Sequence, residues 1–145
     1  MSKTTQTITL AILKPDTIRS GNAGSVINML EDAGFKICAS KVLRLRQSEA
    51  EAFYGVHRER PFFESLVQFM TSGPCMPLAL GHERAVSYLR EVIGATDPSE
   101  AAEGTIRALY AESKERNAIH ASDSDANAQL ELGFFFNRLE LITEA

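Results

Sequence analysis

The sequence predicts one α/β or α+β domain in which helices cover a single sheet. The chain has 145 residues, a common size for one domain, and 44% of its residues are hydrophobic. Segments that suit strands alternate with segments of helical spacing, and pairs of helices lie between them. No internal repeat, linker or low-complexity tract divides the chain, so we expect residues 1–145 to form a single domain.

The first part of the chain supplies two predicted strands and one predicted helix. Residues 7–13 are rich in threonine, isoleucine and leucine, which favours a buried strand, and residues 14–16 (Lys-Pro-Asp) end it in a turn. Apolar residues recur at helical spacing over 26–33, and Gly34 suits the carboxy-terminal cap of that helix. Residues 35–45 then form the second predicted strand.

The middle of the chain predicts two further helices. Ser48 and Glu51 have the spacing of a capping box and open a helix that includes Tyr54. A second helix begins at Pro61, since proline suits the first helical position. Gly73 and the proline after it end this helical region.

The last part of the chain contains a long irregular connection between regular elements. We expect a short strand over 76–80 and a helix over 83–93 that Gly94 closes. Residues 95–116 show only short helical pieces, and a closing helix follows over about 124–135. A loop of that length inside a compact domain is usually functional. These patterns do not determine the strand order.

Charge and composition exclude several classes of protein. The net charge of −4 gives no overall attraction to nucleic acid or anionic membranes, so we expect no specific partner of either kind. Cys38 and Cys75 lack metal-finger spacing and indicate reduced, packed thiols. No apolar run reaches membrane-spanning length, and residues 1–6 lack an apolar signal core. We therefore expect a cytoplasmic protein.

Residues 117–124 (Asn-Ala-Ile-His-Ala-Ser-Asp-Ser) place His120 beside several short hydrogen-bonding side chains. A neutral imidazole is a competent nucleophile near neutral pH. Serine and aspartate are equally typical of a helix cap, in which case His120 simply lies on the preceding loop. Taken alone, the segment favours the helix cap, because serine and aspartate are common before helices.

Several residues elsewhere in the chain suit a nucleotide. Lys14, Arg90 and Arg107 could bind phosphate if they converge, although a solvated surface charge is the better interpretation of any one of them alone. Thr96 could add a hydroxyl or simply lie in a turn. Phe62 could stack on a nucleobase, but an aromatic residue at helical spacing is more often part of the core. Neither G-x-x-x-x-G-K-[ST] nor G-x-G-x-x-G is present, so any nucleotide must be held without those loops.

In this order and spacing, the segments resemble the nucleoside diphosphate kinases over essentially the whole chain. The matching motifs are Leu13-Lys14-Pro15-Asp16, Tyr54, Arg60-Pro61-Phe62-Phe63, Met70-Thr71-Ser72-Gly73-Pro74, Arg90, Gly94-Ala95-Thr96-Asp97-Pro98, Gly104-Thr105-Ile106-Arg107 and residues 117–124. The resemblance implies a ferredoxin-like core with a four-stranded antiparallel sheet, whose short last strand lies near His120. It also implies ping-pong transfer of the γ-phosphate of ATP or another nucleoside triphosphate to a nucleoside diphosphate.

The same resemblance implies a role for each site residue. His120 would become the phosphohistidine, and supporting it would be Tyr54, Ser122 and Glu131. Phe62 would stack on the base, while phosphates and ribose would contact Lys14, Arg90, Thr96, Arg107 and Asn117. Mg²⁺ would arrive on the nucleotide phosphates with no direct protein ligand. The assembly implied is a homo-oligomer, either a tetramer or a hexamer.

One departure from the family concerns Ala121, where glycine is usual. If the backbone there has a positive φ, alanine costs on the order of 1 kcal/mol, and if the position only needs close packing it costs little. Ala121 therefore leaves one alternative function, a catalytically impaired kinase-like interaction protein. A second alternative is a nucleic-acid-binding protein, which the acidic balance disfavours.

Overall fold

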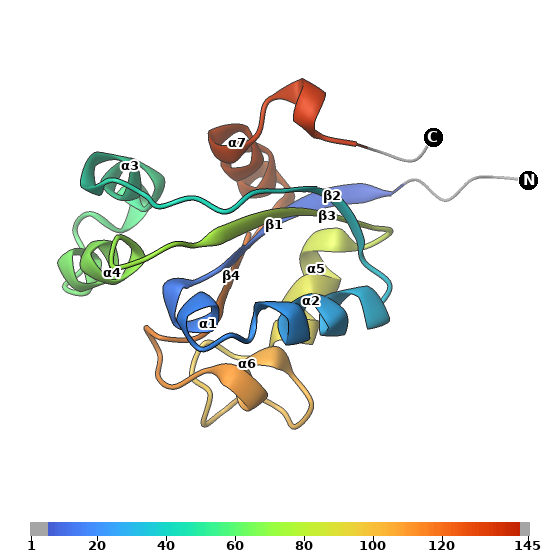
Figure 1. The fold of residues 1–145 in the computed structure, drawn as a ribbon, viewed down its shortest axis with the longest axis horizontal. Helices are drawn as coiled ribbons and strands as arrows, with labels where there is room; N and C mark the ends of the chain where they lie inside the picture. Colours follow the sequence, from blue (N-terminus) through green and yellow to red (C-terminus); the bar gives the residue numbers. More distant parts are fainter. Residues whose placement is uncertain (1–5, 143–145) are drawn as a thin grey trace, which may run out of the picture.

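The computed structural model describes residues 6–142, so the expected features of residues 1–5 and 143–145 lie outside it. It shows a four-stranded antiparallel sheet with helices on both faces (Figure 1). The strand order is β2-β3-β1-β4, where the strands are β1 (Thr7–Leu13), β2 (Lys36–Ser40), β3 (Met76–His82) and β4 (Ile119–Ala121). This confirms the expected ferredoxin-like sheet and its short last strand. Within residues 6–142, no helix is long and apolar enough to cross a membrane.

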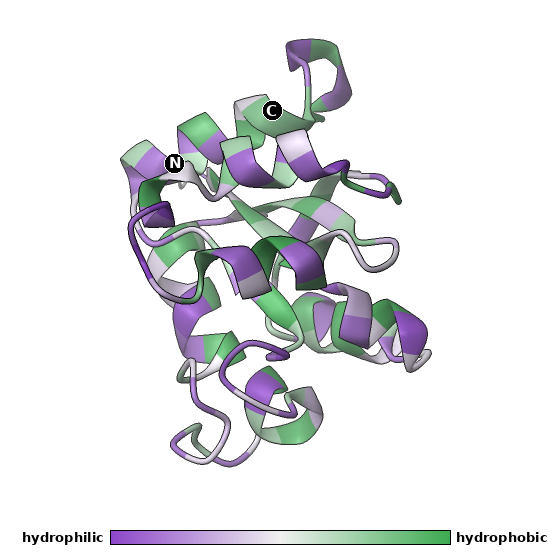
Figure 2. Ribbon diagram, turned by 90° about the vertical axis from the view of Figure 1, so that its left-hand side faces the viewer, coloured by the Kyte–Doolittle hydropathy of each residue, from purple (hydrophilic) through white to green (hydrophobic). Residues whose placement is uncertain are grey.

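Two layers of helices enclose the sheet. The core on one face is formed with α2 (Ala23–Asp32), α5 (Ala85–Ile93) and α6 (Ile106–Tyr110). The core on the other face is formed with α3 (Gln47–Phe53), α4 (Phe63–Met70) and α7 (Asp125–Phe135). The remaining short helices are α1 (Pro15–Arg19), η1 (Gly55–His57) and η2 (Arg138–Glu140). Figure 2 shows the hydrophobic strands enclosed between helices that are partly hydrophilic.

The central strand β1 explains why its sequence is apolar without alternation. Leu10 and Ile12 pack with the α3, α4 and α7 side, whereas Ala11 and Leu13 pack with the α2 and α5 side. Successive side chains of a strand point to opposite faces, and both faces are covered here. The strand predicted over residues 7–13 is therefore confirmed, and its end places Lys14 at the edge of the core.

Two predictions for helix starts are wrong, and one short helix was not predicted. The helix α3 begins at Gln47 rather than after a Ser48 cap, because the Glu49 carboxylate accepts from the Arg46 backbone N–H at 2.8 Å. The helix α4 begins at Phe63 rather than Pro61, since residues 61 and 62 lie in a turn. Where only a turn was expected after β1, Pro15 occupies the first position of α1.

The second strand is shorter than predicted, and the glycine caps are confirmed. The ladder of β2 ends at Ser40 after a bulge, and the chain rejoins β3 through one bridge from Leu43 to Cys75. Gly34 and Gly94 end their helices at φ values of +98° and +89°, which side chains disfavour. Cys75 is buried, as is Cys38, in agreement with their expected packing.

Candidate active site

The predicted site residues converge on one cavity of about 600 Å³ beside the edge strand β4. Nine of the ten line it, namely Lys14, Tyr54, Phe62, Arg90, Thr96, Arg107, Asn117, His120 and Glu131. The tenth, Ser122, is buried and contacts the cavity wall through Glu131. These residues come from strands, helices and loops far apart in sequence; Lys14 and Asn117, for example, are 103 positions apart, so the fold is what brings them together.

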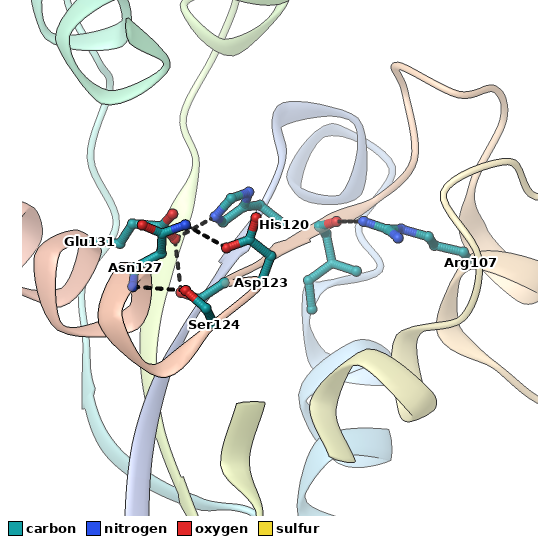
Figure 3. A network of polar contacts seen from close by, with 8 residues as sticks. Arg107, His120, Asp123, Ser124, Asn127 and Glu131 are labelled. Atoms are coloured by element: carbon teal, nitrogen blue, oxygen red, sulfur yellow. Dashed lines mark hydrogen bonds and ion pairs between the residues drawn. The ribbon is translucent and has the colours of Figure 1, made fainter. Parts of the chain in front are cut away.

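A carboxylate on α7 orients the imidazole of His120. The Nε2 atom of His120 lies 2.8 Å from Oε1 of Glu131, and the Ser122 hydroxyl donates to the same oxygen at 2.8 Å. Figure 3 shows the His120 and Glu131 side chains pointing toward each other. Because a carboxylate only accepts hydrogen bonds, the contact places a ring proton on Nε2. In the neutral ring, Nδ1 is then the nitrogen that carries the lone pair.

Burial controls the charge of this imidazole. The side chain of His120 is 20% exposed, and loss of solvent lowers its pKa below the usual histidine value. The hydrogen bond and the negative charge of Glu131 act in the opposite direction, while the nearby Lys14 and Arg107 charges lower the pKa further. The net effect favours the neutral ring near pH 7, which is the nucleophilic form.

Two aromatic rings pack edge-on against the imidazole. The ring centroids of Phe53 and Tyr54 lie 5.4 Å and 6.1 Å from that of His120, at interplanar angles of 73° and 89°. Burial raises the pKa of Tyr54, so its phenol stays protonated. Its hydroxyl is buried and has no hydrogen-bond partner among the residues that the structure describes. The role of Phe53 was missed because an aromatic residue at helical spacing gives the same signal as an ordinary core residue.

Lys14 is a buried ammonium at the end of β1. Its Nζ donates to Oδ1 of Asn117 at 2.8 Å and to the backbone oxygen of Glu115 at 3.5 Å. Burial, followed by the Arg107 charge, lowers the pKa of Lys14 to about 8. The ammonium is therefore still mostly charged at pH 7, and a bound phosphate would stabilise its charged form further.

Arg107 is held by backbone oxygens that surround the histidine segment. Its Nε, Nη1 and Nη2 donate to the oxygens of Asn117 at 3.3 Å, Gly94 at 3.1 Å and Ile119 at 2.8 Å. Figure 3 shows the Arg107 and Glu131 side chains on opposite sides of His120. A guanidinium has five N–H groups, so two remain for a ligand. Burial and the Arg90 charge lower the pKa of Arg107 to about 10, which leaves it charged at neutral pH.

The strained backbone of the site lies at Ala118 rather than at Ala121. Ala118 has φ of +75°, the only positive value at a non-glycine position within residues 6–142. The Ile119 N–H donates to the Asn117 oxygen at 2.9 Å, which closes a three-residue turn around it. Ala121 instead pairs with Ala11 in the β ladder and is buried. The absence of glycine at 121 therefore concerns packing and not a positive φ.

The rim of the cavity is more exposed than its floor. Arg90 and Thr96 are exposed, and Phe62 is 46% exposed with its ring centroid 5.4 Å from that of His57. The backbone oxygen of Thr96 accepts from the Asn117 amide at 3.4 Å.

Sequence reasoning also missed a polar pair in the wall of the cavity. Asp123 and Asn127 both line it, and the Asn127 amide donates to Oδ1 of Asp123 at 2.6 Å. Their spacing of four residues was the available signal, since it brings a helix residue back over the preceding turn. Within the described chain, no group of three or more His, Cys, Asp or Glu side chains is placed to hold a metal ion.

Comparison with known proteins gives one consistent result. A family model described as nucleoside diphosphate kinase matches residues 7–141. Nucleoside diphosphate kinases from Salinibacter ruber and Chlorobaculum tepidum are 52% and 56% identical over 92% of this chain, and the match covers 94% and 96% of those proteins.

Solved structures agree over the same length. The nucleoside diphosphate kinase of Aquifex aeolicus superposes with a TM-score of 0.93 at 45% identity, covering 95% of this chain and all of that one. The halophilic enzyme from Halobacterium salinarum, solved in complex with CDP, also gives 0.93 at 34% identity, covering 97% and 94%. The sequence motifs, the sheet topology and these matches lead to one conclusion: the chain belongs to the nucleoside diphosphate kinase family.

Proposed function

We propose that this protein is an active nucleoside diphosphate kinase that works through a phosphohistidine on His120. The observation that carries the proposal is the 2.8 Å contact between His120 Nε2 and Glu131 in a cavity lined by cationic side chains. This contact leaves the lone pair on Nδ1, which attacks the γ-phosphorus of a nucleoside triphosphate, mainly ATP. The bond from that phosphorus to the bridging oxygen breaks, and the diphosphate leaves with the electron pair. A terminal oxygen of a second nucleoside diphosphate then displaces His120 from the phosphoryl group.

The cationic residues would position and neutralise the phosphates. Lys14 supplies a point charge, and Arg107 supplies its two uncommitted N–H groups. Arg90 and Thr96 lie on the exposed rim, where they would contact phosphate oxygens, while Asn117 would bridge Lys14 and the ribose. Catalysis would then consist mostly of placement and charge neutralisation.

Phe62 would stack on the nucleobase at the mouth of the cavity. The partly exposed ring is available to a planar ligand, and a base of any kind has a π-face. Because stacking reads no hydrogen-bonding edge of the base, the enzyme should accept all common nucleotides. That property suits a protein that maintains cellular pools of nucleoside triphosphates.

The donor set of the cavity fits Mg²⁺ that is carried by the nucleotide. Lysine, arginine and amide groups dominate the phosphate side of the cavity, and among described residues no three carboxylate, cysteine or histidine side chains converge. Mg²⁺ typically keeps several waters and binds substrate phosphates, where it would neutralise part of their charge.

We further propose that the whole chain forms one kinase domain that assembles as a cytoplasmic homo-oligomer, either a tetramer or a hexamer. Exposed apolar side chains on the edge strand β2 and near the carboxy-terminal end, including Ile37 and Ile142, support association. The alternative of a catalytically impaired interaction protein is not favoured, because the relatives matched over nearly the full length are named as the enzyme.

The test is a phosphoryl-transfer chase. The purified protein is incubated with Mg²⁺ and γ-labelled ATP and then with unlabelled GDP. We expect acid-labile label on the protein that moves to GTP, and no protein label in His120→Ala, which should still bind nucleotide. Label that persists in that variant, or a parent protein that binds ATP and never becomes labelled, would contradict the proposed nucleophile.

A further inference from the structure

The turn that precedes the catalytic strand is held in a conformation that its own residue disfavours. Ala118 has φ of +75°, a region that L-residues other than glycine rarely adopt. It lies between Asn117, which contacts Lys14, and the short strand that carries His120. Such a conformation persists only where surrounding contacts enforce it.

The chain segment that follows β1 supplies those contacts. Oδ2 of Asp16 accepts from the Ala118 N–H at 3.0 Å. The Thr17 hydroxyl donates to the Ala118 oxygen at 2.8 Å, and the Lys14 backbone N–H donates to the same oxygen at 2.9 Å. The backbone N–H and oxygen of Ala118 are therefore both held by residues around the start of α1, namely Lys14, Asp16 and Thr17.

Two features of Asp16 indicate that this contact has more than a local structural role. Asp16 and Thr17 are 6% and 2% exposed, so the hydrogen bonds are shielded from water. Within the described residues, the second oxygen of Asp16, Oδ1, is buried with no hydrogen-bond partner. A buried carboxylate that is only half satisfied is costly, so the contact of its other oxygen with Ala118 must compensate.

We propose that Asp16, assisted by Thr17, is a positioning residue that holds the Ala118 turn and thereby sets His120 and Asn117 against Lys14. This inference rests on the proposed function of His120 for its catalytic consequence. Without the clamp, Ala118 would relax toward negative φ, and the peptide units on either side would rotate. Asn117 would then leave the Lys14 ammonium, and the imidazole would lose its alignment with Glu131. Misplacement of reacting groups by about 1 Å costs up to roughly 100-fold in rate.

The decisive experiment combines substitutions at positions 16 and 118. Asp16→Ala removes the acceptor, whereas Asp16→Asn keeps an oxygen that can accept from the Ala118 N–H and removes the charge. Ala118→Gly makes positive φ acceptable without a clamp. Val26→Ala, in the core on α2 and away from the cavity, is the matched control for a general loss of stability.

Each variant is measured for kcat, KM and urea midpoint, and the His120 ring is titrated by NMR without nucleotide. We expect Asp16→Ala to lower kcat by roughly tenfold to a hundredfold and to shift the His120 titration, while Asp16→Asn stays near the parent protein. The double variant Asp16→Ala/Ala118→Gly should recover at least half of the lost kcat on a logarithmic scale. Val26→Ala should lower the urea midpoint with kcat unchanged.

Two results would overturn the proposal. One is an equal loss in Asp16→Asn and Asp16→Ala, which would assign the effect to charge. The other is a kcat loss that Ala118→Gly does not relieve, which would make Asp16 a general structural residue. If Asp16→Ala does not fold, Thr17→Val, which removes the donor and keeps the shape, replaces it in the same comparison. The NMR titration needs no turnover, so an inactive parent protein would refute the proposed function and still decide the role of Asp16.

Discussion

The low pKa of Lys14 predicts a fall in activity on the alkaline side of neutrality. A group with a pKa of about 8 is charged in about 90% of molecules at pH 7 and in about 10% at pH 9. If the ammonium is needed for phosphate binding, kcat/KM should therefore fall about tenfold per pH unit above pH 8. Phosphate groups finish ionising near their second pKa of about 6, so the phosphates of the substrates do not titrate in that range.

The assay is a steady-state pH profile of the parent protein and Lys14→Met, which is similar in shape and uncharged at every pH. The variant should be slower at pH 7 and should show no alkaline fall near pH 8. In the parent protein, the fall in kcat should occur at a higher pH than the fall in kcat/KM, because bound phosphate raises the pKa of Lys14. A fall near pH 8 that persists in Lys14→Met would refute the assignment.

The same pKa has a consequence for stability with a defined sign. Lowering the pKa of Lys14 from 10.5 to about 8 means that folding is roughly 3 kcal/mol less favourable with the ammonium charged than with the amine neutral. The unfolded chain binds the proton more tightly, so this cost is present in full below pH 8 and disappears as pH rises toward 10.5. The free energy of unfolding of the parent protein, measured with urea relative to Lys14→Met, should therefore rise by up to about 3 kcal/mol between pH 7 and 10.

Three further predictions concern the backbone, the histidine and the base. Gly94→Ala should lower the free energy of unfolding, measured with urea, by roughly 2–4 kcal/mol, and Gly104→Ala by only about 1–2 kcal/mol. Both glycines have positive φ, but only at Gly94 would an added Cβ lie 2.5 Å from a neighbouring hydroxyl, that of Thr105. Equal losses in the two variants would contradict this reasoning. Glu131→Gln should lower kcat roughly tenfold. It should also lower the pKa of His120 in an NMR titration, because the Glu131 carboxylate raises that pKa in the parent protein. A rise of the His120 pKa in this variant would be inconsistent with the geometry. Phe62→Ala should raise KM roughly tenfold for all four bases alike, and a selective loss for one base would show that the ring does more than stack.

The parts of the fold that were predicted correctly are those with a strong local signal. The strand over residues 7–13 is apolar throughout because both of its faces are covered, and Gly34 and Gly94 mark helix ends because their positive φ excludes most side chains. The predicted start of α3 was wrong, because the observed capping box pairs Arg46 with Glu49 rather than Ser48 with Glu51. Local sequence does not decide between such nearly equal caps.

The site shows a similar division between local and long-range information. His120 and its polar neighbours were visible in the sequence, but each cation taken alone was better explained as a surface charge. Only the resemblance to the family grouped the cations into a site. Lys14 and Asn117 are 103 positions apart, and only the sheet topology brings them to 2.8 Å. The strain at Ala118 was not predictable, because alanine gives no signal of positive φ and the contacts that enforce it come from residues 16 and 17.

In the three-residue strand β4, side chains alternate between the two faces of the sheet, so the position of His120 in the strand decides which face it reaches. Ile119 and Ala121 pack into the core shared with α2 and α5, while His120, opposite Ile12 in the ladder, faces the side of α3 and α7. A slip of the ladder by one residue would exchange these faces and bury the imidazole among aliphatic side chains. The position of His120 in this short ladder is therefore strict, because only every second residue of β4 faces the cavity.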